Sequence, residues 1–170
     1  MHRTRRAALL GLAGLPMILW RKPAWASPFR EIFWNDLIPS DAPRSETARG
    51  GDHDERSGAQ APDFDASAYK FVEALNGTRI RMPGFMLPVE TDGRGVTAFI
   101  LTPYVGACIH VPPPPPNQLV FVTSERPWPS EAMFDAVWVS GTIRVNLITT
   151  TLAEIGYDVV ADEIEAYVWE

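Results

Sequence analysis

Cysteine and histidine are almost absent from this chain. Cys108 is its single cysteine, and His110 is its only histidine outside the first 63 residues. One cysteine excludes a disulfide within the chain. In an oxidising compartment, such a thiol is buried, bound to a ligand or paired with another chain.

Catalytic signatures are missing as well. The chain contains no Gly-x-Ser-x-Gly elbow, no His-Glu-x-x-His, no Cys-x-x-Cys and no phosphate loop. Cys108 and His110, with Asn117 as an orienting group, have the composition of a nucleophilic site, but their spacing matches no catalytic signature. We therefore expect a protein that is not an enzyme.

The N-terminus has the pattern of an export signal. Its apolar run, residues 7–20, is too short and too rich in Gly and Pro to span a membrane comfortably. Ala24-Trp25-Ala26 predicts a cleavage site, with Ser27 as the first mature residue. Arg5 and Arg6 resemble a twin-arginine signal, with ordinary secretion as the alternative. We expect loss of residues 1–26 and a periplasmic protein without a stable membrane anchor.

Removal of residues 1–26 makes the protein strongly acidic. That segment carries five basic and no acidic residues, so the mature chain has 10 basic and 21 acidic residues and a net charge of −11. This charge excludes general electrostatic binding to nucleic acid or anionic lipid. It favours solubility, or a cationic or basic partner.

The mature chain divides into two parts. Residues 27–63 begin with an apolar segment around Trp34 and continue, from residue 40, as a polar stretch without periodicity, which predicts a flexible linker. We expect the apolar segment to dock on the domain or on a partner. Residues 64–170 are expected to be the domain proper and to fold alone.

Residues 64–170 have the pattern of a mainly β domain. A short amphipathic helix is expected over 65–75, and helical turns over 130–135 and 150–156. Strands are expected over 78–89, 96–101, 119–123, 137–145 and 164–169. The first strand is long and contains Pro83-Gly84, which suggests a bend that lets it serve both halves of a sheet. We therefore predict a small five-stranded OB-like barrel with short helices, with a small β-sandwich as the alternative.

The segment 106–118 combines Cys108 and His110 with five consecutive prolines. On an extended backbone, residues two apart point to the same face, so the thiolate and the imidazole would meet one ligand. These donors suit zinc or copper(I), with carboxylates, water or a second chain completing the site. The alternative is a buried thiol and a histidine that is hydrogen-bonded to the backbone.

The proline run predicts a polyproline II rod about 15 Å long, at about 3.1 Å per residue. Such a rod docks into an aromatic groove on a partner, or it packs against the protein's own tryptophans and tyrosines. The residues that we expect at a partner-binding site are Trp34, Pro112, Pro113, Pro114, Pro115, Pro116, Asn117 and Gln118.

This motif and its surroundings carry a resemblance to a known family. The sequence around Cys108 and His110 resembles the signature of exported bacterial proteins known as domain of unknown function 3299. The resemblance covers most of residues 31–170 and includes Trp34, Leu37, Pro39, Leu75, Gly77, Pro83, Gly84, Phe85, Pro88, Val89 and Glu90. Members occur beside metal-related transporter components, which implies a periplasmic accessory role in metal handling. The chain departs from many members in its long 40–63 segment, and it lacks the lipobox that anchors some of them.

Two functions follow from these residues. In the first, a periplasmic accessory protein uses Cys108 and His110 to bind zinc or copper, or to contact a transporter component. In the second, a structural module without metal docks another envelope protein through the proline rod and the Trp34 segment.

The metal hypothesis makes a prediction that mutation can test. If Cys108 and His110 are ligands, Cys108→Ser and His110→Ala each abolish binding of zinc or copper and change stability little. If they are core residues instead, the same changes lower the melting temperature and leave the metal content unchanged. Calorimetric titration of the purified apoprotein decides between the two, and the absence of binding tighter than about 1 mM, about −4 kcal/mol, eliminates the metal site.

Overall fold

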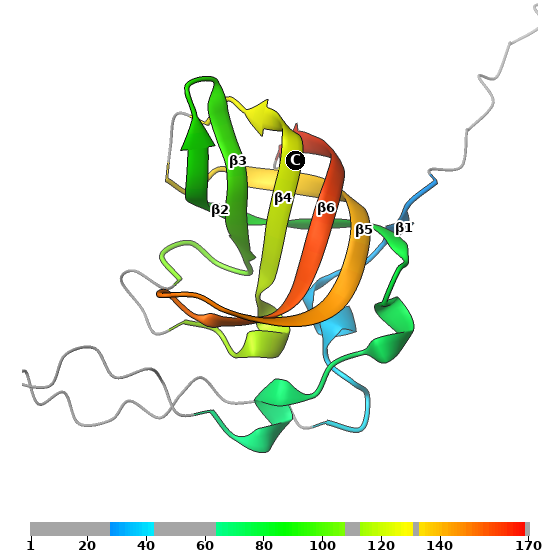
Figure 1. Cartoon of the computed structure of the whole chain (residues 1–170). Coiled ribbons are helices and arrows are strands. Elements are labelled where there is room, and N and C mark those ends of the chain that lie inside the picture. The colour runs from blue at the N-terminus through cyan, green and yellow to red at the C-terminus, as the bar shows by residue number, and fades with distance from the viewer. Residues whose placement is uncertain (1–27, 43–63, 108–112, 131–132, 169–170) are drawn as a thin grey trace, which may run out of the picture.

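The computed structural model describes residues 28–42, 64–107, 113–130 and 133–168. Most of them form a closed barrel (Figure 1) whose strands are β2 (Arg79–Asp92), β3 (Gly95–Thr102), β4 (Val120–Trp128), β5 (Ala136–Thr149) and β6 (Glu154–Ala166). The strand order is β2-β3-β4-β6-β5, and β5 pairs back with β2. β4 and β6 run parallel, whereas the other barrel pairs are antiparallel. The prediction of a mainly β, five-stranded OB-like barrel is confirmed.

Strand β2 closes the barrel because it pairs on both sides. It pairs with β5 from Arg79 to Phe85 and with β3 from Phe85 to Asp92, as the predicted bend requires. Gly84 lies at this changeover, but it is not one of the glycines with positive φ. A Cβ at Gly84 would lie 2.7 Å from Leu101 Cγ and 2.8 Å from Trp34 Cζ2. Glycine is therefore required here by the close approach of two side chains.

The N-terminal segment, residues 28–42, packs on the barrel. Its short strand β1 (Arg30–Glu31) runs parallel to β2, and the Ile32 N–H donates to the Arg81 carbonyl at 3.0 Å. Ile32 and Leu37, which ends the 3-10 helix η1 (Trp34–Leu37), are buried in the main core. Of the two alternatives for this segment, docking on the domain is thus observed. Because β1 covers the part of β2 that β3 leaves unpaired, it also protects an open sheet edge.

The predicted helix over 65–75 is wrong. Two short 3-10 helices, η2 (Ala66–Tyr69) and η3 (Glu73–Leu75), stand there, with extended backbone at Lys70 between them. The reason is competition from tertiary hydrogen bonds. The carbonyls of Ser67 and Lys70 accept from Asn117, and the Val72 N–H donates to a tyrosine hydroxyl, so these groups are not available for an α-helix.

Two further short elements differ from expectation. The segment 150–156 is not helical, because a turn closed by hydrogen bonds between Thr150 and Ala153 leads directly into β6 at Glu154. In 130–135, Met133 and Phe134 form a turn, and residues 131–132 lie outside the described part. Among the residues that the structure describes, no helix has the length and apolar character needed to cross a membrane.

Substitution of Gly84 tests the close approach at the β2 bend. Gly84→Ala should lower the free energy of unfolding by about 1–3 kcal/mol, because Leu101 and Trp34 must move to admit a methyl group. The matched control is Gly93→Ala, since a Cβ at Gly93 meets no atom within 4 Å, and it should change stability by no more than about 0.5 kcal/mol. Urea unfolding measures both. Equal effects of the two variants would contradict the packing argument.

Candidate functional site

The residues of the predicted metal site lie outside the described residues. This holds for Cys108 and His110, so metal binding stays a prediction, and it also holds for Pro112 of the expected partner-binding residues. Within the described ranges, no group of three or more His, Cys, Asp and Glu side chains gathers in a way that could hold a metal ion.

The described part of the proline run belongs to the protein's own packing. Pro114, Pro115 and Pro116 are buried, and Pro115 has φ −61° and ψ 155°, which is close to polyproline II geometry. The short helix η4 (Pro116–Gln118) then turns the chain into β4. Over these three prolines, the run is therefore buried within the protein.

Asn117 and Gln118 connect this turn to the N-terminal half of the chain. The buried Asn117 amide donates to the carbonyls of Ser67 and Lys70 at 3.0 and 3.3 Å. The Gln118 amide donates to the Trp34 carbonyl at 2.9 Å. The structure therefore brings together Trp34 and Gln118, two of the residues expected at a partner-binding site, but as an internal contact of the fold.

Tyr157 on β6 completes these connections, and the sequence did not point to it. Its hydroxyl accepts from the Val72 N–H and donates to the Leu37 carbonyl, both at 2.8 Å. Phe71 packs edge-on against its ring, with centroids 5.6 Å apart. Burial raises the pKa of Tyr157 to about 12. We call Tyr157, Asn117 and Gln118 the polar clamp, because they join the N-terminal segment, the 64–78 segment and the barrel.

An apolar groove of about 200 Å³ opens beside Trp34. Eight residues from the N-terminal segment and four strand regions line it: Phe33, Trp34, Pro83, Gly84, Phe85, Pro103, Ala136 and Tyr167. Four of them are aromatic, and the Tyr167 hydroxyl is the only side-chain polar group apart from the Trp34 indole N–H. This lining suits contact with flat apolar groups and offers no acid, base or nucleophile of ordinary reactivity near pH 7.

One wall of the groove is a stacked arrangement of side chains. Tyr167 stacks on Trp138 with centroids 5.4 Å apart and an interplanar angle of 29°, and the Arg81 guanidinium lies 4.1 Å from the Trp138 ring centroid. Phe33 meets the same indole edge-on at 6.4 Å. Trp138 thus packs against Arg81, Tyr167 and Phe33, and it supports the two lining residues Phe33 and Tyr167.

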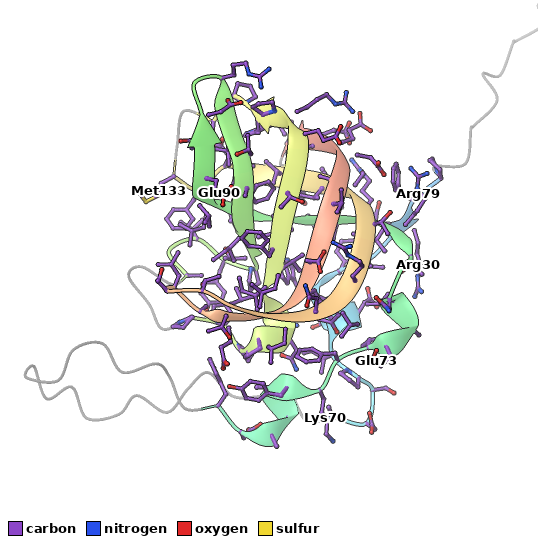
Figure 2. The ribbon with its side chains drawn as sticks, viewed as in Figure 1. Arg30, Lys70, Glu73, Arg79, Glu90 and Met133 are labelled. Atoms are coloured by element: carbon purple, nitrogen blue, oxygen red, sulfur yellow. The ribbon has the colours of Figure 1, made fainter. Side chains whose placement is uncertain are left out.

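Several charged residues lie close in sequence to the residues that line the groove. The charged residues within two positions of a lining residue, in the described ranges, are Glu31, Asp36, Arg81, Asp135 and Glu165. Arg81 is shared between Glu165 at 3.0 Å and Glu31 at 3.6 Å. Glu31 and Glu165 thus share one guanidinium, whereas Asp36 accepts from the Phe33 N–H and Asp135 accepts from the Trp128 indole N–H. Arg30 and Arg79 lie on the β1 side of the barrel, away from Glu90 and Met133 (Figure 2), and Arg79 is paired with Asp162 at 3.2 Å.

Sequence reasoning found only part of this groove. It singled out Trp34 and the Pro83-Gly84 bend, because these carry local signals. Phe33, Phe85 and Tyr167 were not expected at a site, since each is an ordinary apolar residue in its own segment. Only the closure of the barrel brings them together.

Comparison with known proteins assigns the chain to a family. Residues 34–166 match the family described as "Protein of unknown function (DUF3299)". The chain belongs to this family. Among solved structures, it is similar to a DUF3299 family protein from Pseudomonas aeruginosa PAO1, with 36% identity and a TM-score of 0.70, over 84% of this chain and 98% of that one. This relative bears out the family resemblance.

Other comparisons add little to the DUF3299 assignment. An OBody, AM3L09, bound to hen egg-white lysozyme matches with 17% identity and a TM-score of 0.34, over 58% of this chain and 90% of that one. No functionally curated protein matches the chain.

The polar clamp predicts how stability depends on pH. The folded-state pKa of Tyr157, about 12, lies above the ordinary value of 10.0, so the unfolded chain loses this proton first. The stabilisation that comes from the protonated Tyr157 hydroxyl is fully present below about pH 10. It is lost as the pH rises through 12, and this loss lowers the free energy of unfolding by up to about 3 kcal/mol.

Tyr157→Phe is the variant that isolates this effect. It should cost about 1–3 kcal/mol at pH 7, because the Val72 N–H and the Leu37 carbonyl lose their partner. Its stability should then fall less steeply than that of the wild type between pH 10 and 12. Parallel curves for the two proteins in urea unfolding would show that Tyr157 does not titrate as described.

Proposed function

We propose that this DUF3299 protein is an exported, non-enzymatic interaction module that docks another envelope protein in the groove beside Trp34. The single observation that carries the proposal is the groove itself, an apolar hollow with four aromatic side chains on a closed barrel. Aromatic residues in a preformed hollow are the usual anchors of protein interfaces, because they offer a large contact area at a small cost in conformational entropy.

Exposure of Phe33 supports the same conclusion. Its side chain is 49% exposed although it lies between the buried Ile32 and the half-buried Trp34. The Phe33 N–H donates to Asp36 at 2.8 Å, which holds the start of η1 and thereby the position of this ring. A large aromatic side chain that is held at the mouth of an apolar groove is more useful for contact with a partner than for the core.

The face that OB-type barrels use for oligonucleotides or oligosaccharides is covered here. Ile100 and Phe121 alternate with core residues along β3 and β4, so they point out of the barrel. A second cluster closes over them, formed with Leu87, Leu119, Ile155, Phe134, Ile148 and Ala153. With this face filled by its own chain, the groove on the β1 side is the better candidate for binding.

Photo-crosslinking in a bacterium that produces the protein tests the proposal. Benzoylphenylalanine in place of Phe33 should form one main adduct with another envelope protein, identified by mass spectrometry. The matched control is benzoylphenylalanine in place of Leu147. This residue lies on β5, is 50% exposed and is not one of the residues that line the groove.

The adducts distinguish the outcomes clearly. The purified adduct partner should bind wild-type protein and the Leu147→Ala variant equally, and Phe33→Ala at least about tenfold more weakly. No adduct at position 33, the same adduct at both positions, or an adduct between two copies of this chain would each overturn docking of another protein in the groove.

A further inference from the structure

Resting on the proposed docking function, we infer that the groove takes a proline-rich segment in polyproline II conformation, flanked by Lys or Arg residues of the partner. The inference names the class of ligand rather than a particular protein. It follows from three features of the groove: the state of the nearby sheet edge, the shape and chemistry of the lining, and the charges beside it.

The sheet edge beside the groove excludes addition of a β-strand. Strand addition needs a run of unpaired backbone N–H and C=O groups along one strand. Strand β1 already pairs with Ile80 and Arg81 of β2, and the Ile32 N–H donates to the Arg81 carbonyl. Pro83 has no N–H, and from Phe85 onward β3 occupies the edge. A ligand here must bind through its side chains and isolated carbonyls.

The lining fits proline better than it fits a helix. A docked helix presents anchors at i, i+3, i+4 and i+7 and needs a long apolar trough, whereas this groove measures about 200 Å³. Proline-rich segments lay flat pyrrolidine rings against aromatic faces, and Trp34, Phe33 and Tyr167 supply such faces. Their rigid backbone needs no ladder of hydrogen bonds and loses little conformational entropy on binding.

The charges beside the groove add the basic flanks. Two carboxylates, Glu31 and Glu165, share the Arg81 guanidinium. That guanidinium lies over the Trp138 ring, which the lining residues Phe33 and Tyr167 contact. The side chains of Glu31 and Glu165 are 51% and 47% exposed, so they remain accessible to a cation from solution. Cationic residues beside the proline core would therefore be attracted, and acidic ones repelled.

A synthetic peptide of sequence Arg-Pro-Pro-Leu-Pro-Pro-Arg, capped at both ends, tests the inference on the purified mature protein. We expect binding tighter than about 1 mM by fluorescence titration of the tryptophans. Amide shifts in two-dimensional NMR should map to residues around Phe33, Phe85 and Tyr167, and not to the β5–β6 turn. Because the map uses the wild-type protein, it does not depend on any variant folding.

Matched peptides and variants test each part of the recognition. Replacing every proline by alanine should weaken binding at least about tenfold, as should Phe33→Ala in the protein, while Leu147→Ala leaves it unchanged. Exchanging both arginines for glutamate should weaken binding at least about threefold, and Glu165→Gln should reduce the preference for arginine. Equal binding of the alanine peptide, or shifts away from the groove, would overturn the inference.

The two proposals fail in different ways. An adduct with an envelope protein at position 33, together with no binding of the proline peptide, would leave the docking function standing and remove the polyproline ligand. Peptide binding in the groove without any adduct in cells would remove the envelope partner while the ligand class is kept. Failure of both experiments removes the groove as a docking site.

Discussion

The buried hydroxyl of Tyr157 is the contact on which the rest of this structure depends. It bonds both the N-terminal segment, through the Leu37 carbonyl, and the 64–78 segment, through the Val72 N–H. A buried hydroxyl without partners is costly, and so are the two backbone groups that it satisfies. These needs are met together only when both segments lie against β6. The groove depends on the same contact, because Trp34 reaches its place over Gly84 only if η1 is seated.

Local chemistry in the sequence was enough to predict the barrel. The Pro83-Gly84 pair inside an apolar run marks the bend of β2, and the runs that became β3 and β5 carry clear strand patterns. β6 was foreseen only at its end, because Gly156, Asp158 and a series of acidic residues interrupt its apolar alternation. The helix expected over 65–75 failed for a different reason. Its backbone groups bond to Asn117 and Tyr157, and such distant partners leave no trace in the local pattern.

The candidate site was less predictable than the fold for the same physical reason. Trp34 was identified because it stands in an isolated apolar segment. Phe85 and Tyr167 share the groove with it only because β2 changes partner at Phe85 and β6 ends beside β5. The proline run is the opposite case. Its local pattern is exceptional, yet that pattern could not decide between an exposed rod and an internal one. The buried Pro114, Pro115 and Pro116 serve the interior.

The polar clamp joins residues that lie far apart in the sequence, and this distance has a consequence for the synthesis of the chain. Leu37 and its partner Tyr157 are 120 residues apart, and the N-terminal segment leaves the ribosome first. Its binding place, formed by β2, η4 and β6, is complete only when nearly all of the chain has been made. The apolar side chains of Ile32 and Leu37 therefore stay exposed until the barrel has formed. The barrel forms slowly, because its strand pairs join distant parts of the chain. Completion of nearly the whole chain, rather than emergence of its first strands, is therefore the earliest point at which this protein can become native.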